Sequence, residues 1–168
     1  AASSVAVTTA GGAVPDGYVM AAMVNTGGTG SANVTPPVGW TIHDQRTLGP
    51  NNARIGLFTK KAASEGLTQT FSCADATSME ALIVWFSGVD ATTPLDNVTP
   101  VVAIGTDASI EFADLTTLTD NAMNVLLAYE AAFYPTMPVS YNPGGHSANT
   151  INSAYLVKAA KGLITGLT

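Results

Sequence analysis

Glu80-Ala-Leu-Ile-Val-Trp-Phe-Ser-Gly-Val89 is the stretch that decides the fold of this chain. Successive side chains of a strand point to opposite faces, so residues 81, 83 and 85 would face one way and residues 82, 84 and 86 the other. All six are apolar, which predicts a central strand packed on both faces. A second stretch, Val34-Thr-Pro-Pro-Val-Gly-Trp40, leads from a Pro and Gly turn into the next strand-like run.

The rest of the chain repeats short runs of Val, Ile, Thr and aromatic residues bounded by Gly, Pro, Asn and Asp, which predict strands. Residues 18–24 are apolar on both faces, and we expect them to form a central, buried strand. Thr41–Leu48 carries charged residues and is expected at a sheet edge or facing solvent. Further strands are expected at residues 4–9, 53–61, 67–73, 98–104, 108–113 and 122–130. Only residues 159–167 fit a helix.

Short strands at this density predict an all-β fold, a two-sheet antiparallel sandwich of the jelly-roll type. A length of 168 residues with 46% hydrophobic residues suits a single domain over residues 1–168. The sequence ends in Gly162-Leu-Ile-Thr-Gly-Leu-Thr168. A closing strand at this edge is missing, formed by the terminus itself, or supplied by a partner chain, and these three alternatives stay open.

Composition narrows the classes of partner. Only 11% of the residues are charged and the formal net charge is -6, which argues against nucleic acid, because nucleic-acid affinity depends on clustered Lys and Arg. No apolar run approaches the roughly 20 residues needed to span a bilayer, so no membrane insertion is expected. Cys73 is the only cysteine, which excludes an internal disulfide.

Nucleophilic catalysis needs a Ser or Cys beside a base that an acid orients. The candidates are Cys73, His43 with Asp44, and His146 with Ser147. Neighbouring residues of a strand face opposite ways, so His43 and Asp44 are not expected to act together. The sequence predicts no catalytic residues, no metal site and no cofactor.

Two further kinds of site have structural readings that we prefer. Trp40 could stack on a sugar, but a Trp that enters a strand after a turn more often plugs the core, with its indole N–H on a carbonyl. Trp85 is expected in the core. Asp90 and Asp96 offer oxygen ligands for Ca²⁺, yet a capped turn is the better interpretation.

A hydrolase with paired carboxylates stays open as the least favoured alternative, because sequence does not show which acids face each other. The Glu residues considered for it are expected on solvated faces: Glu65, Glu80, Glu111 and Glu130. Residues 133–150 are rich in Pro, Gly, Asn and Ser and predict a surface loop with a short strand inside it. Loops on rigid sandwiches often contact partners. The candidate contacts are Phe133, Tyr134, Met137, Tyr141 and His146.

Five short blocks, in this order, carry a resemblance to a known module: Val14-Pro-Asp-Gly-Tyr-Val-Met-Ala-Ala-Met-Val24, Thr35-Pro-Pro-Val-Gly-Trp-Thr41, Leu57-Phe-Thr-Lys-Lys-Ala62, Ile83-Val-Trp-Phe-Ser-Gly-Val-Asp90 with Thr93-Pro-Leu-Asp96, and Asp120-Asn-Ala-Met-Asn-Val-Leu-Leu127. They resemble a β-sandwich module that recurs in bacteriophage virion proteins (tail fibres and capsid decorations) and in bacterial surface proteins. The chain departs from it in reading Pro-Asp-Gly before Tyr18, where Gly-Asp is usual, and in stopping where members add a closing strand.

The resemblance implies a non-enzymatic structural component of a phage virion, located in the particle. It would be a capsid-decoration or tail-appendage protein that assembles as a homo-oligomer and contacts a capsid or tail protein or a host-surface glycan. The alternative is a secreted or cell-surface carbohydrate-binding module or adhesin.

Overall fold

The computed structural model describes residues 3–8, 12–28, 32–48, 53–90, 92, 93, 96, 115–129, 142–146, 151–158 and 162–164. These residues form antiparallel strands and no helix, which confirms the predicted all-β sandwich class. The chain divides into two compact units, residues 1–94 and residues 95–168, and each is described by itself. The single domain expected from the sequence stays a prediction.

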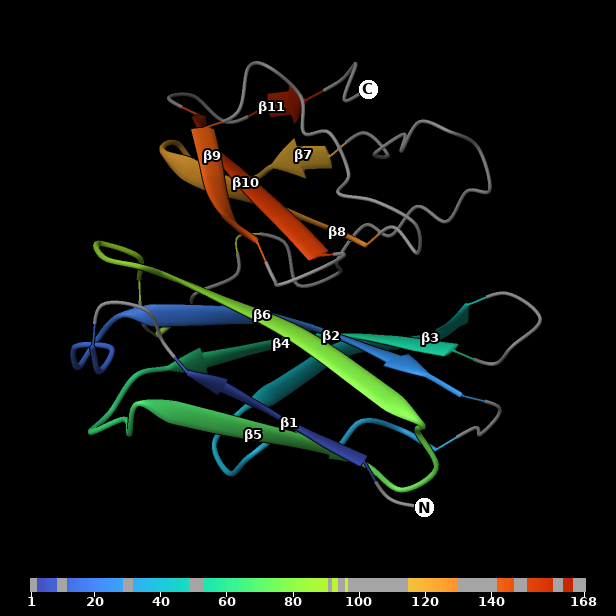
Figure 1. The fold of residues 1–168 in the computed structure, drawn as a ribbon. Helices are drawn as coiled ribbons and strands as arrows, with labels where there is room; N and C mark the ends of the chain where they lie inside the picture. Colours follow the sequence, from blue (N-terminus) through green and yellow to red (C-terminus); the bar gives the residue numbers. More distant parts are fainter. Residues whose placement is uncertain are drawn as a thin grey trace. The chain divides into compact units, whose positions relative to one another are not determined.

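Unit 1 consists of two antiparallel sheets (Figure 1). A four-stranded sheet has the order β3-β4-β2-β6, and a two-stranded sheet pairs β1 with β5. The strands of this unit are β1 (Ser3–Thr8), β2 (Val19–Gly27), β3 (Thr41–Leu48), β4 (Ala53–Lys61), β5 (Thr68–Cys73) and β6 (Ser78–Phe86).

Strand order confirms two expectations and corrects a third. β2 lies between β4 and β6 and is buried along nearly its whole length, as its doubly apolar sequence predicts. β3 is the outermost strand of its sheet, which confirms that its charged residues mark an edge. β6, however, is the other outermost strand and not a central one. Its apolar sequence reflects burial of both faces at Leu82, Ile83 and Val84, which does not require a strand partner on each side.

The core of unit 1 lies between the two sheets. Met20 of β2, Phe58 of β4 and Phe71 of β5 are fully buried there. Val5 and Val7 of β1 pack against this cluster from the smaller sheet. The alternation in β5 is strict, with every second side chain buried, because one face of this strand covers the core and the other faces solvent.

The segment from residue 32 to residue 40 links the edge of one sheet to the edge of the other. Thr35 pairs with Ser72 at the edge of β5, with N···O distances of 2.7 and 3.0 Å in the two directions. The Gln45 side chain of β3 grips the Val34 backbone, accepting from its N–H at 2.8 Å and donating to its carbonyl at 3.0 Å. Val34 is thereby held in the core, where it is buried.

Unit 2 contains β7 (Leu115–Thr117), β8 (Ala122–Tyr129), β9 (Asn142–His146), β10 (Ile151–Lys158) and β11 (Gly162–Ile164). β10 pairs with β8 and with β9, and β11 pairs with β7. The helix expected over residues 159–167 is therefore wrong at residues 162–164, because these residues form a sheet ladder. Residues 162–164 pair with β7, and the three alternatives for the closing edge stay open. The short strand expected within residues 133–150 is β9. The strands expected at residues 98–104 and 108–113 lie outside the described residues.

Among the described residues, no helix is long and apolar enough to cross a membrane.

Candidate functional site

Trp40 was expected either to stack on a sugar or to plug the core. The side chain is only 8% exposed, and its ring meets Phe71 edge-on at a centroid distance of 5.4 Å. The indole N–H donates to the side-chain carbonyl of Gln69 at 3.0 Å. Trp40 therefore plugs the rim of the core and has no free face on which a sugar could stack. This confirms the structural reading. Trp85 packs against the same core while staying half-buried.

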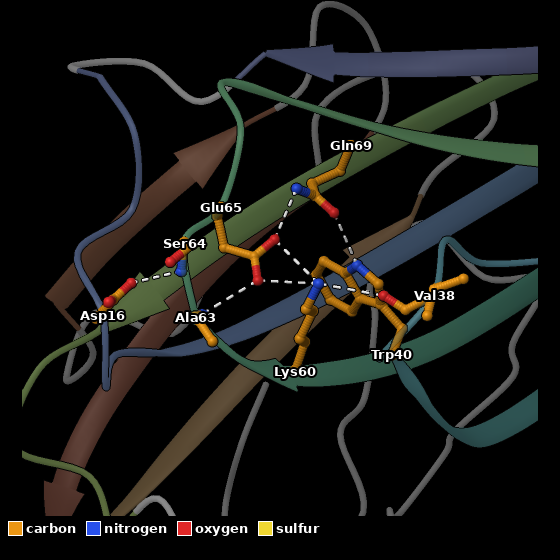
Figure 2. Close-up of polar contacts among 8 residues, drawn as sticks. All are labelled: Asp16, Val38, Trp40, Lys60, Ala63, Ser64, Glu65 and Gln69. Carbon is orange, nitrogen blue, oxygen red and sulfur yellow. Dashed lines mark hydrogen bonds and ion pairs between the residues drawn. The ribbon is translucent and has the colours of Figure 1, made fainter.

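Trp40 belongs to a set of hydrogen-bonded side chains that we call the Glu65 network: Trp40, Lys60, Glu65 and Gln69 (Figure 2). One Glu65 oxygen accepts from Lys60 Nζ at 2.9 Å and from the Ala63 N–H at 3.2 Å. The other accepts from Lys60 Nζ and from Gln69 Nε2, each at 3.0 Å. Lys60 also donates to the Val38 carbonyl at 3.1 Å. The loop before β3 is thus held at two points, Val38 and Trp40.

Local backbone geometry aims Glu65 into this position. Ala62 continues the β4 ladder for one residue, with its N–H on the Tyr18 carbonyl at 2.7 Å and its carbonyl on the Gly17 N–H at 2.9 Å. Ser64 then adopts a left-handed conformation with φ of 55°, which costs free energy for a residue other than glycine. The Asp16 carboxylate accepts the Ser64 N–H and compensates for part of that cost.

The electrostatic environment of Glu65 keeps its carboxylate charged and bonded inside the protein. Its side chain is 4% exposed, and burial by itself raises the pKa of this carboxyl. The hydrogen bonds and charge of Lys60, with those from Ala63 and Gln69, outweigh burial and lower the pKa below its ordinary value. A general acid at neutral pH needs the opposite, a raised pKa. All four contacts are already made inside the protein, so the carboxylate is equipped to hold the fold and not to transfer a proton.

Glu65 also corrects the sequence interpretation, which placed it on a solvated face. Burial of this carboxylate was not expected, although its partners are near it in sequence: Lys60 in β4, Ala63 in the connection between β4 and β5, and Gln69 in β5. No periodic pattern in the sequence indicates that these side chains come into contact. Glu80 is half-buried in β6, whereas Glu111 and Glu130 lie outside the described residues.

His43 and Asp44 have different partners, as expected. His43 Nε2 lies 2.6 Å from the Thr59 hydroxyl, and Asp44 forms an ion pair with Arg46 at 2.5 Å. The β3–β4 register shifts between Ile42 and Asp44, so the regular alternation invoked for these residues is interrupted here. Partial burial lowers the pKa of His43, which favours its neutral form.

Cys73 has a structural environment. It is buried in β5, with its Sγ 3.5 Å from the Ala32 carbonyl and 3.6 Å from Asp75 Oδ1. The Asp75 carboxylate in turn accepts the Ala32 N–H, at 3.0 Å through its closer oxygen. These contacts fasten the start of the 32–40 segment to the end of β5. A thiol in such a buried place is a poor nucleophile because it cannot meet a substrate.

Asp90 and Asp96 have different roles, so the predicted capped turn is observed at Asp90 only. Asp90 caps its own turn, accepting from the Thr92 N–H at 2.8 Å and the Thr93 hydroxyl at 2.9 Å, and these bonds lower its pKa. Asp96 instead accepts from the Leu118 N–H at 2.5 Å and the Thr119 hydroxyl at 2.6 Å. These bonds, the Thr119 hydroxyl first, lower the pKa of Asp96. Asp96 thus ties the start of unit 2 to the loop between β7 and β8.

The expected partner contacts cannot be placed in the same way. Phe133, Tyr134, Met137 and Tyr141 lie outside the described residues, and His146 is the last residue of β9. Within the described ranges, no group of three or more His, Cys, Asp or Glu side chains is placed to hold a metal ion. Compared with protein-family models, with curated proteins and with solved structures, the chain gives no match.

Proposed function

We propose that this chain is a non-enzymatic structural component of a bacteriophage particle. It is a capsid-decoration or tail-appendage protein that assembles as a homo-oligomer and contacts a capsid or tail protein. The observation that carries the proposal is that the side chains of unit 1 best suited to binding or catalysis serve to hold the fold together. Trp40, Glu65 and Cys73 are the residues most suited by type to binding or chemistry, and each makes its hydrogen bonds inside the protein. Trp40 and Glu65 both bond to Gln69, and Cys73 bonds to the Ala32 carbonyl.

The sequence blocks behind the module resemblance support the same proposal. Four of the five fall on elements that build unit 1: the turn into β2, the Trp40 segment, β4, and β6 with the Asp90 turn. Their residues supply the tight turn at Gly17, the Trp40 plug and the Phe58 core position. Blocks of this kind specify a scaffold, and a scaffold protein acts through its surfaces and its assembly.

The location is tested on phage particles sedimented from the source culture. An antibody raised against the purified chain should label the particles in immunogold electron microscopy, and mass spectrometry should find the chain among their abundant proteins. A particle preparation that lacks the chain contradicts the proposal. The control is the same preparation from a culture in which the gene is disrupted.

The biochemical alternatives are tested on the purified chain. Light scattering coupled to size-exclusion chromatography should give a mass that is a multiple of the monomer mass. A chain that is monomeric at every concentration, and that binds one class of glycan on an array, favours the secreted adhesin or carbohydrate-binding module. Turnover of a polysaccharide that one Glu→Gln change abolishes favours the hydrolase.

A further inference from the structure

The free edge of β3 is the surface of unit 1 best suited to pairing with another chain. Within the described residues, β3 has a strand partner on one side only, namely β4. An outermost strand presents backbone N–H and C=O groups that another strand can bind. The described side chains of β3, from Thr41 to Thr47, are exposed or half-buried, so the described part of the chain leaves them accessible to a partner.

The charged residues of this edge would complement those of a second, antiparallel copy of β3. Asp44 and Arg46 are two residues apart and therefore lie on the same face of β3, where Arg46 Nε and Asp44 Oδ2 are 2.5 Å apart. Their side chains stay 23% and 46% exposed. In an antiparallel pair of two such strands, with a twofold axis beside Gln45, Asp44 of each copy lies opposite Arg46 of the other.

We propose that β3 pairs antiparallel with β3 of a second copy of this chain, about a twofold axis beside Gln45, with Asp44 and Arg46 forming two intermolecular ion pairs. This inference rests on the proposed function, in which the chain assembles as a homo-oligomer, and it names the surface used. A twofold interface of this kind is self-complementary, because the same patch serves both partners.

The charge pattern selects the register as well as the partner. Opposite charges directly across an antiparallel pair are favourable, and like charges are unfavourable. A shift of the second strand by two residues would place Arg46 opposite Arg46 of the other copy, or Asp44 opposite Asp44, and both ion pairs would be lost. Charge on an edge strand discourages general aggregation, while the alternating pair Asp44 and Arg46 leaves one register permitted.

Exposed apolar side chains lie at the start of the same strand. Ile42 is 51% exposed, and Val38, in the loop that leads into β3, is 94% exposed. The antiparallel arrangement brings the end of the partner's β3 beside Ile42, and contact there would remove the Ile42 side chain from water. The register shift between Ile42 and Asp44 restricts the regular ladder to the residues that follow it. The ladder is short, so we expect a weak dimer whose population rises with concentration.

The test uses charge reversals on the full chain. Asp44→Arg places two basic residues on each edge and Arg46→Asp places two acidic ones, so each variant opposes itself with like charges at both symmetric positions. Sedimentation velocity should show dimerisation of each variant alone to be weaker by roughly tenfold or more than that of the wild type. An equimolar mixture of the two variants should restore a dimer, because basic residues then face acidic ones.

Two further variants keep the experiment decisive. The exchange Asp44→Arg with Arg46→Asp retains the intrastrand ion pair and the complementarity, and it should dimerise about as well as the wild type. Lys61→Asp changes the net charge by the same amount as Arg46→Asp, at an exposed residue at the end of β4, and it should leave dimerisation unchanged. Circular dichroism verifies that each variant is folded. If a single reversal does not fold, the exchange variant and the Lys61→Asp control still test the proposal, because an exchange variant that fails to dimerise while the control dimerises would contradict it.

Failure of this inference can be told apart from failure of the proposed function. A wild-type oligomer that neither reversal weakens, or a mixture that restores nothing, overturns pairing through β3 while leaving the virion proposal intact. A wild type that is monomeric but present in particles overturns both β3 pairing and the homo-oligomer, and leaves only the location in the particle supported. Restoration by mixing, combined with absence from particles, supports β3 pairing and contradicts the virion assignment.

Discussion

Glu65 shows how much of this sandwich depends on one residue. Burying a carboxylate is unfavourable unless its oxygens are bonded and its charge is balanced. Lys60 supplies the charge, and Gln69 and the Ala63 N–H supply the remaining contacts. Because Gln69 also receives the Trp40 indole N–H, the carboxylate and the aromatic plug are held by the same amide.

Replacing Glu65 by Gln should lower the free energy of unfolding by about 1–3 kcal/mol. The amide has one acceptor oxygen where the carboxylate has two, and it leaves the Lys60 ammonium without a counter-charge. Urea unfolding followed by tryptophan fluorescence measures the change. Lys61→Gln, at the exposed neighbour of Lys60, is the control and should stay within about 0.5 kcal/mol of the wild type. Equal stability of both variants would show that the Glu65 network contributes nothing.

Trp40→Phe separates the hydrogen bond of the indole from its packing. Phe retains an aromatic ring beside Phe71 but leaves the Gln69 carbonyl without its donor, which should cost about 1–3 kcal/mol. Trp40→Ala removes the plug as well and should cost about 3–5 kcal/mol. Both values come from chemical denaturation. If a folded Trp40→Phe variant lost binding to a glycan that the wild type binds, the assignment of Trp40 to the scaffold would be wrong.

At the scale of elements, β4 shows how one small residue allows a large one to enter the core. A Cβ on Gly56 would lie 2.6 Å from two ring carbons of Phe58, closer than atoms of this kind approach one another. Phe58 is fully buried, so its ring has little room to move. The ring of Phe58 therefore occupies space over the backbone of Gly56, and the two residues form one packing unit within the strand.

Gly56→Ala should therefore destabilise the protein by about 1–3 kcal/mol, as overpacking of a core does. This sign is opposite to the usual effect of replacing glycine by alanine, which reduces the entropy of the unfolded chain. Gly66→Ala is the matched control, because a Cβ there meets nothing within 4 Å. Thermal unfolding of both variants checks the prediction. A Gly56→Ala variant as stable as Gly66→Ala would mean that Phe58 moves aside without cost.

At the scale of the whole molecule, the pH dependence of stability should carry the signature of Glu65. Its pKa is lower in the folded protein than its ordinary value of 4.5, so the unfolded chain binds the proton more readily. The stabilisation is therefore complete above pH 4.5 and is lost as the pH falls through the folded pKa. His43, whose pKa is also lowered in the fold, acts in a higher window: its contribution declines as the pH falls below its ordinary value of 6.5.

The difference in unfolding free energy between the wild type and Glu65→Gln should accordingly shrink with acidification below pH 4.5. Above that pH the difference should be constant, since His43 titrates equally in both proteins. Urea unfolding at a series of pH values measures it. A difference that stayed constant down to the lowest pH at which both proteins fold would assign the effect of the substitution to shape and not to charge.

Much of the fold could be predicted because strand signals are local. The doubly apolar run in β2 and the charged run in β3 each indicate burial or exposure through residues within the run itself. The same reasoning misplaced β6 as central, since an apolar strand reports buried faces and not the number of strand partners. It also failed at residues 162–164, where pairing with β7 overrides the local preference.

The sequence by itself determined the all-β class, the edge position of β3 and the burial of Trp40, because alternation and turn residues act within a few positions of one another. Only the tertiary structure decided that Glu65 is buried, that Gln69 joins it to Trp40, and that Asp96 bonds to Leu118 and Thr119. The bonds of Trp40 to Gln69 and of Asp96 to Leu118 and Thr119 join residues 22 to 29 positions apart, whereas the partners of Glu65 lie within five positions of it. The physical reason is that a buried polar group takes whichever partners the fold brings within hydrogen-bond distance, and sequence spacing carries no record of that distance.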